Sequence, residues 1–356
     1  MSRFVCAIVI FFLPFPLPGA EGEKEAARLA RPNVTSPVTQ RSLRLVGSIS
    51  SSDDVRGKLT GAAPQTQPQS DTLRLTKPNS VAVDKAGRIF VADPTHRGIL
   101  VFDRQAQTLV RWTGNNQYPL FGPAGIAFDG DGRLFVTDVY KADVVVFDTA
   151  GTPVAVFGKE VLKRPEGIAI DTQRARIYVG DMRLHQVASF DLRTFVPGQV
   201  IGPSESGDSP DASRLFAPGN IALDSKGQLY VSDASTCRVH VFAPGSALLR
   251  AFNTPCGRQA GPGRPIAISS DDRVYVADAE DETIQRVEAN GKAIVLAAPA
   301  VKAQSSRFVR TGLAVDGENR LYVAEQGPDQ GRVQIFEQRR GSKQRAERVP
   351  DGTRQK

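Results

Sequence analysis

One short phrase recurs six times in this 356-residue chain, and it restricts the fold more than any other feature of the sequence. An apolar triplet with a short polar residue after it is followed, nine or ten positions on, by an acidic residue that closes a second apolar run. The copies begin at residues 81, 126, 168, 221, 266 and 313. Their spacing of 42–53 residues is typical of the blades of β-propellers.

Each copy contains several short runs with the composition of β-strands. In the second copy these are "IAFD" (126–129), "RLFVTD" (133–138), "DVVVF" (143–147) and "PVAVFG" (153–158), here called strands a, b, c and d. Between strands a and b, five copies place a residue that tolerates positive φ at one fixed position. These residues are Gly87, Gly132, Gly227, Asp272 and Asn319, and the third copy has an insertion there. We therefore expect a left-handed turn that serves the backbone.

A single four-stranded sheet cannot bury both of its faces, but six such sheets packed radially can. The sixth copy stops after "RVQIFE" (332–337) without a fourth strand, whereas "LRLVGSI" (43–49) resembles the d strands. The sequence predicts an all-β fold, a six-bladed β-propeller of four-stranded antiparallel blades. We expect the N-terminal strand 43–49 to pair with 332–337 and close the ring.

The segment "GPAGIAFDGDGRLFVTDVYKADVVVFDTAGTPVAVFG" (122–158) resembles an NHL repeat, a family of mostly six-bladed β-propellers. The resemblance covers residues 43–337. Relatives in this family serve as protein-binding or RNA-binding platforms, and a minority are enzymes, including peptidyl-α-hydroxyglycine lyases. The resemblance therefore implies the fold, while the function has to be argued from the residues of the site.

The regions outside the repeats predict an exported chain. Residues 1–20 combine Arg3, an apolar run and small residues before a charged segment, as in a signal peptide. Residues 21–42 read as a disordered linker and 338–356 as a disordered basic tail. After signal removal Cys237 and Cys256 remain, and in a secreted or periplasmic protein they can form one disulfide. Strand pairing across the turn after strand c of the fourth blade would bring them close together.

The net charge of +7 is concentrated in the tail, where seven Lys and Arg residues against two acidic ones give +5. The body is therefore near neutral, which disfavours nucleic acid as a partner. We expect no stable membrane span after signal cleavage, and a monomer.

Two candidate sets are better explained as structural. The acidic residues that end strand b precede a tight b–c loop in every copy, where an Asp side chain caps backbone amides. The three histidines, His96, His185 and His240, share neither depth nor face. The lyases that resemble these repeats bind zinc through convergent histidines, so a zinc lyase site is not supported.

The face where the b–c and d–a loops meet is the remaining candidate. On this face, the loops of blades one to three are expected to form a positively charged half that includes an aromatic residue. The acidic residues 280–282 lie on the opposite half. The candidate binding residues are Arg97, Tyr140, Lys141, Arg183, Glu166, Arg264, Asn79 and Asn220. Such a divided surface suits a protein or peptide partner recognised by charge.

The sequence thus predicts an exported scaffold that binds a protein or peptide through its loops, without catalytic residues and without a cofactor. The alternative is a metal-dependent enzyme, lyase-like or lactonase-like, at the channel mouth. Glu166, Asn79 and Asn220 would then supply oxygen ligands to calcium, a thin ligand set.

Overall fold

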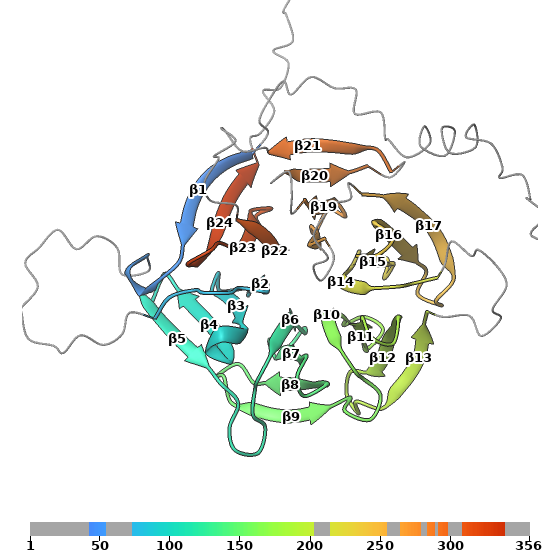
Figure 1. Ribbon diagram of the computed structural model, residues 1–356, viewed down its shortest axis with the longest axis horizontal. Helices are drawn as coiled ribbons and strands as arrows, with labels where there is room; N and C mark the ends of the chain where they lie inside the picture. Colours follow the sequence, from blue (N-terminus) through green and yellow to red (C-terminus); the bar gives the residue numbers. More distant parts are fainter. Residues whose placement is uncertain are drawn as a thin grey trace, which may run out of the picture. The chain divides into compact units, whose positions relative to one another are not determined.

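The computed structural model describes residues 43–54, 73–202, 214–254, 264–278, 283–288, 291–297 and 308–338. These residues form six four-stranded antiparallel sheets arranged as a ring (Figure 1). Helix within them is confined to two short 3-10 segments, η1 (Ser52–Asp54) and η2 (Pro94–His96). The predicted six-bladed all-β propeller is confirmed.

The blades follow one another along the chain, and in each the strands run from the channel outward. Blades one to three consist of β2 (Ser80–Val83), β3 (Ile89–Asp93), β4 (Gly98–Asp103) and β5 (Thr108–Trp112); β6 (Pro123–Phe128), β7 (Leu134–Asp138), β8 (Asp143–Phe147) and β9 (Pro153–Phe157); and β10 (Pro165–Asp171), β11 (Arg176–Asp181), β12 (Gln186–Asp191) and β13 (Pro197–Ile201).

Blades four and five are built in the same way, and blade six borrows its outer strand from the beginning of the chain. They consist of β14 (Pro218–Leu223), β15 (Leu229–Asp233), β16 (Arg238–Phe242) and β17 (Leu248–Asn253); β18 (Ile266–Ile268), β19 (Val274–Ala277), β20 (Ile284–Val287) and β21 (Ala293–Ala297); and β22 (Val309–Val315), β23 (Leu321–Gln326), β24 (Gly331–Gln338) and β1 (Leu43–Ile49).

The ring closes through β1, as predicted. β1 pairs antiparallel with β24, from Leu43 opposite Gln338 to Ile49 opposite Val333. Leu43 and Ile49 are both buried, so the strand contributes apolar contacts as well as hydrogen bonds. A shift of register falls between Leu45 and Gly47.

The core lies between neighbouring blades. Strands β7 and β8 are buried at every position because each blade packs against a neighbour on both faces. In one cluster Phe135 and Val144 of blade two pack against Ile177 and Phe190 of blade three. The outermost strands are the exposed ones, which is what radial packing of twisted sheets requires.

The turn between strands a and b has the predicted left-handed geometry. The φ angle is +84° at Gly132, +60° at Asp272 and +61° at Asn319, and the third blade uses Ala175 with φ +51°. Residues of different kinds therefore occupy one backbone position.

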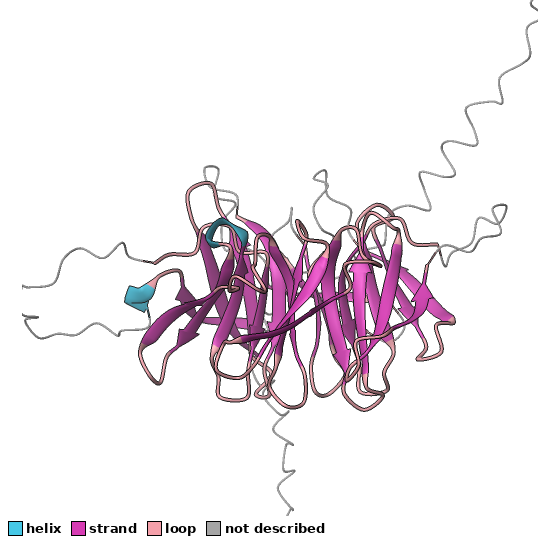
Figure 2. Ribbon diagram, turned by 90° about the horizontal axis from the view of Figure 1, so that it is seen from below, coloured by secondary structure: helices cyan, strands magenta, loops and turns pink. Residues whose placement is uncertain are grey.

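Strand direction divides the loops between two faces of the ring. The b–c and d–a loops share one face, called the loop-rich face below, and the a–b and c–d turns share the other. The short η2, a b–c loop of blade one, lies along the upper edge of the ring in Figure 2 and so marks the loop-rich face. Within the described part of the chain there is no apolar helix long enough to cross a membrane.

Candidate functional site

The aspartate at the end of strand b holds together the two loops of each blade on the loop-rich face. Asp138 accepts hydrogen bonds from the backbone N–H groups of Tyr140 (3.0 Å) and Lys141 (3.1 Å) in the b–c loop. It also accepts bonds from Phe121 (2.6 Å) and Gly122 (3.0 Å) in the d–a loop. The predicted capping role is confirmed, and the second loop is an addition that the sequence did not indicate.

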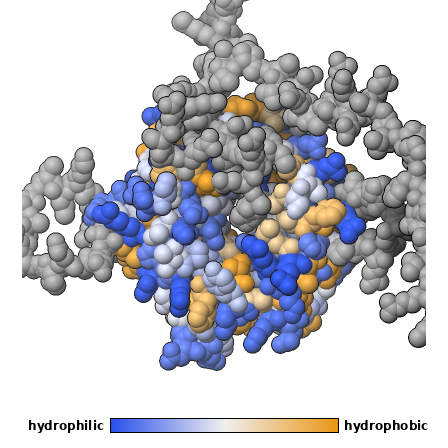
Figure 3. Space-filling view, in the orientation of Figure 1, coloured by the Kyte–Doolittle hydropathy of each residue, from blue (hydrophilic) through white to orange (hydrophobic). Residues whose placement is uncertain are grey.

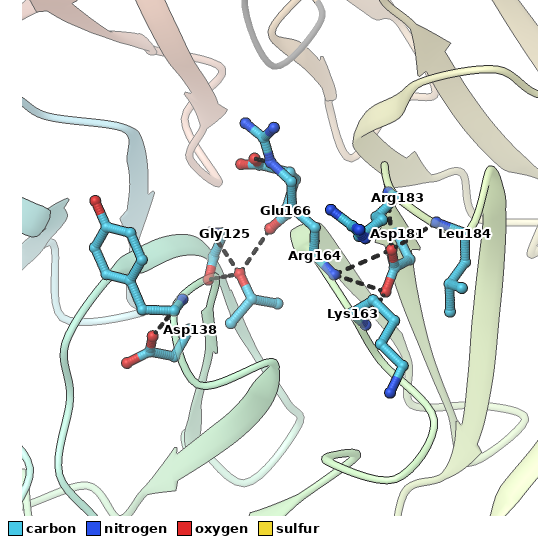
Figure 4. Close-up of polar contacts among 10 residues, drawn as sticks. Gly125, Asp138, Lys163, Arg164, Glu166, Asp181, Arg183 and Leu184 are labelled. Carbon is cyan, nitrogen blue, oxygen red and sulfur yellow. Dashed lines mark hydrogen bonds and ion pairs between the residues drawn. The ribbon is translucent and has the colours of Figure 1, made fainter.

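The same arrangement recurs around the ring. Asp93, Asp181 and Asp233 each accept backbone N–H groups from a b–c loop and from the preceding d–a loop. Figure 4 shows this for Asp181, which contacts Lys163, Arg164, Arg183 and Leu184. The loop-rich face is therefore a set of rigid loop pairs rather than a set of independent loops.

Blades one and two bring four side chains together on this face, here called the Phe121 cluster: Arg97, Phe121, Tyr140 and Lys141. The Arg97 guanidinium carbon and the Lys141 Nζ each lie 5.5 Å from the centroid of the Phe121 ring. This distance is within the range of cation–π interactions. The Tyr140 ring packs beside them against Gly122, where a Cβ atom would come within 2.5 Å of it. Three of these residues were predicted, and the structure adds Phe121.

The cluster is open to solvent, and its two cations form no ion pair within the described part of the chain. Tyr140 is 78% exposed and Phe121 38%, although large apolar side chains are usually buried. Neither Arg97 nor Lys141 forms an ion pair with another described residue. An exposed aromatic surface held between two cations is suited to an anionic partner that also offers apolar contacts.

A buried carboxylate follows the b–c loop that carries Tyr140 and Lys141. Asp143, the first residue of β8, is opposite Asp138 across the hairpin and is buried. Among the described residues its Oδ1 atom has no hydrogen-bond partner. Burial, and then the neighbouring Asp138 carboxylate, raise the pKa of Asp143 to about 6, against the opposing effect of Lys141 and Lys159. No signal in the sequence distinguished Asp143 from an ordinary strand residue.

The remaining predicted residues are spread around the loops and the channel mouth. Arg183 is exposed in the b–c loop of blade three. Glu166 is buried, and one of its oxygens lies 3.1 Å from Nε of Arg164. Burial raises the pKa of Glu166, and the Arg164 charge partly offsets this. Asn79 and Asn220 are half-buried at the start of their strands.

Arg264, a predicted binding residue before strand a of blade five, already has a partner inside the protein. It is buried, and its Nη1 lies 2.9 Å from the Asp278 carboxylate. Its charge is therefore compensated inside blade five. An arginine whose guanidinium is buried and already binds an aspartate of its own blade offers little charge to a partner.

Close backbone packing narrows the channel mouth. A Cβ atom at Gly125 would come within 2.2 Å of the Glu166 carbonyl oxygen, and one at Gly167 within 2.3 Å of Gly219 O. The Thr137 hydroxyl donates to that same Glu166 oxygen at 2.7 Å (Figure 4). Strands a of blades two, three and four thus touch here, which leaves the loops as the accessible surface.

A cavity of about 270 Å³ opens on the opposite face among the a–b turns of blades three to five. Its Asp171, Arg174 and Asp272 side chains already have partners within the protein. Asp171 binds Arg174 at 3.0 Å, and Asp272 accepts the Ser225 hydroxyl at 2.6 Å. These hydrogen bonds lower the pKa of Asp272, so the carboxylate is already satisfied within the protein.

The described residues contain no group of three or more His, Cys, Asp or Glu side chains that could hold a metal ion. His96 lies in η2, His185 in a b–c loop and His240 in β16, as predicted from the repeat. The acidic residues 280–282, the signal peptide, the linker, the basic tail and Cys256 lie outside the described residues. The Cys237–Cys256 disulfide stays a prediction.

The face that carries the Phe121 cluster is the one seen in Figure 3. Hydrophilic residues dominate it over blades one to three, and hydrophobic patches interrupt them. This agrees with the mixture of cationic and aromatic side chains in the cluster.

Comparison with known proteins supports the fold and leaves the function open. No family model matches the chain, and no curated protein matches its sequence. The NHL assignment therefore stays a prediction.

Solved structures resemble the chain in fold. A protein of unknown function from Bacteroides thetaiotaomicron is 14% identical, with a TM-score of 0.57 over 74% of this chain and 70% of that one. A streptogramin B lyase is 10% identical, with a TM-score of 0.55 over 74% and 94%. A virginiamycin B lyase from Staphylococcus aureus is 12% identical, with a TM-score of 0.54 over 83% and 99%. At such identities the likeness is one of fold alone.

Proposed function

We propose that this propeller is a binding platform that takes an acidic protein or peptide through the Phe121 cluster. One observation carries the proposal: two cations that form no ion pair with another described residue flank a ring that is 38% exposed, with Tyr140 beside it. Arginine and aromatic residues are the side chains that most often dominate the free energy of protein interfaces.

The loops are held in place before a partner arrives. Asp138 binds the backbone of Phe121, Tyr140 and Lys141, so three members of the cluster depend on one buried carboxylate. Binding would therefore order few loop residues, which reduces the entropic cost of association.

The alternative from the sequence is a metal-dependent enzyme, and two structural neighbours are lyases by name. Sequence identities of 10% and 12% indicate a shared fold but are too low to indicate a shared reaction. We therefore keep the binding platform as the single proposal.

The test uses a labelled oligoglutamate of roughly ten residues, which spans about 35 Å when extended. Fluorescence anisotropy at low salt measures its binding to the wild type and to the double variant Arg97→Glu, Lys141→Glu. We expect the variant to bind roughly 10- to 100-fold more weakly, since each lost charge contact contributes up to about 1 kcal/mol and each new carboxylate repels the probe.

The matched control reverses two exposed arginines, Arg104 and Arg193, in c–d turns of the opposite face. The control variant carries the same change in net charge and should keep binding within about twofold of the wild type, apart from the long-range effect that salt screens. Equal weakening by both variants, or no binding of the probe to the wild type, contradicts the proposal.

A further inference from the structure

We propose that a second anchor, formed by Arg214 and Phe216, lies two blades away from the Phe121 cluster, and that the two anchors together take one extended acidic polypeptide segment. This inference rests on the proposed function and gives the form of the partner. It predicts that a segment has to cross blade three to be bound at full strength.

The two phenylalanines occupy equivalent positions in their blades. Each is the second residue before the proline that begins strand a, Pro123 in blade two and Pro218 in blade four. The backbone N–H of Phe216 donates to Asp233 at 2.6 Å, as that of Phe121 donates to Asp138 at 2.6 Å. The same backbone hydrogen bond therefore holds both phenylalanines on the loop-rich face.

The environment of the second ring repeats the first. Phe216 is 42% exposed, and the Arg214 guanidinium carbon lies 5.1 Å from its centroid. Arg214 is exposed and forms no ion pair with another described residue. Nδ1 of His185 contacts the Phe216 carbonyl oxygen, which ties this anchor to the b–c loop of blade three.

Not every aromatic residue at this position is an anchor. Phe308 of blade six is equivalent in sequence, and Arg332 lies 3.8 Å from its centroid. However, Arg332 also binds the buried Glu325 at 2.7 Å, and the Phe308 ring packs against Gly327. Its cation is compensated and its ring partly buried, so blade six lacks the features that the other two blades share.

Blade three supplies a positively charged path between the anchors. Lys163, Arg164 and Arg183 are exposed on its loops, and of these three Arg164 is paired with Glu166 at 3.1 Å, so Lys163 and Arg183 carry the charge of the path. Figure 4 shows that their backbones converge on Asp181, which is buried and therefore does not present its charge to a partner. Glu166 is buried as well, and the exposed carboxylate in the described part of these loops is that of Glu160.

The arrangement of cations over rings favours an acidic polypeptide over single-stranded nucleic acid. Proteins that bind single strands offer aromatic faces on which bases stack. Here the Phe121 ring has two cations over it and the Phe216 ring has one. Guanidinium groups held against a ring are positioned to bind carboxylates in two-pronged contacts.

The experiment compares labelled oligoglutamates of roughly five and roughly twenty residues, which span about 17 and about 70 Å when extended. The long probe should bind the wild type at least about tenfold more tightly than the short one, because linked contacts raise the effective concentration at the second anchor. In the double variant Arg214→Glu, Phe216→Ala this advantage should disappear, while the short probe still binds within about threefold through the Phe121 cluster.

The matched control is Arg193→Glu with Val196→Ala, an exposed cation and an exposed apolar residue of blade three on the other face. It should keep the advantage of the long probe. Circular dichroism and thermal melting establish that each variant is folded.

The outcomes separate the two proposals. If neither probe binds the wild type, the proposed function fails. If both probes bind but the variant at Arg214 and Phe216 keeps the full advantage of the long one, the platform stands and the second anchor is wrong. A single-stranded oligonucleotide that displaces the long probe at lower concentration than an unlabelled oligoglutamate also overturns the choice of partner.

Discussion

A single buried carboxylate, Asp138, gives the Phe121 cluster its shape. It accepts four backbone N–H groups from two loops, and its side chain is fully buried. Asp138 therefore has the same loop-capping role as the equivalent aspartates of other blades, but the loops that it holds also carry the candidate site.

Replacing Asp138 with Ala should lower the free energy of unfolding by about 2–4 kcal/mol, since it leaves several buried N–H groups without an acceptor. Urea denaturation measures this. The control is Asp103→Ala, which removes a carboxylate that caps the exposed N–H groups of Gln105 and Ala106. That change should cost about 1 kcal/mol or less, because water can replace the lost bonds. If both changes lower the free energy of unfolding equally, Asp138 contributes no more than an exposed turn cap does.

Asp143 gives the protein a dependence on pH with a defined sign. Its raised pKa of about 6 means that the native state holds the proton more tightly than the unfolded chain. The stability from this proton is complete below the unfolded pKa near 3.9 and is lost as the pH rises through about 6.

Asp143→Asn should therefore be more stable than the wild type above about pH 7, by roughly 1–2 kcal/mol, and the difference should vanish near pH 4. Urea denaturation at both pH values tests this, with the same change at the exposed Asp131 as control. A constant difference between variant and wild type at the two pH values would contradict the assignment of the titration to Asp143.

At the scale of the strand, the closing element β1 stabilises the ring through its two buried ends. Ile49→Ala should cost about 2–4 kcal/mol because it leaves a cavity between blades six and one. Val46→Ala in the same strand removes an exposed side chain and should change stability by less than about 0.5 kcal/mol. Chemical denaturation measures the free energy of unfolding of both variants. If Ile49→Ala lowers it as little as Val46→Ala does, the buried end of β1 does not stabilise the ring.

The strands could be predicted from the sequence because every blade repeats the same backbone requirements. Gly132, Asp272 and Asn319 reveal a left-handed turn through their type and spacing, and the structure gives φ values of +84°, +60° and +61°. The candidate site is different. Phe121 looked like part of an irregular d–a loop, since nothing in its local sequence shows that Arg97, 24 residues earlier, lies over its ring.

The same limit applies to Arg264. Its position before strand a made it a candidate binding residue, but whether an arginine there meets solvent or a carboxylate depends on Asp278, which lies 14 residues later, at the end of strand b. Burial and charge compensation arise from tertiary contacts, and repeat spacing carries information on the backbone alone.

At the scale of the whole molecule, the six blades form one continuous ring in which each core cluster is shared by two neighbours. The cluster around Phe90 and Val136 joins blades one and two, and that around Tyr178 and Val231 joins blades three and four. A blade removed from its neighbours would expose both faces, so stability belongs to the ring and not to its parts.

The pairing of β1 with β24 also imposes a delay during synthesis of the chain. Leu43 is made almost three hundred residues before its partner Gln338, so β1 cannot pair until synthesis reaches β24. At a synthesis rate of 5–20 residues per second, β1 would wait roughly 15–60 s as an unpaired apolar strand. During that interval the half-built ring presents an open edge at each end, and a chaperone or a neighbouring nascent chain has its best opportunity to bind.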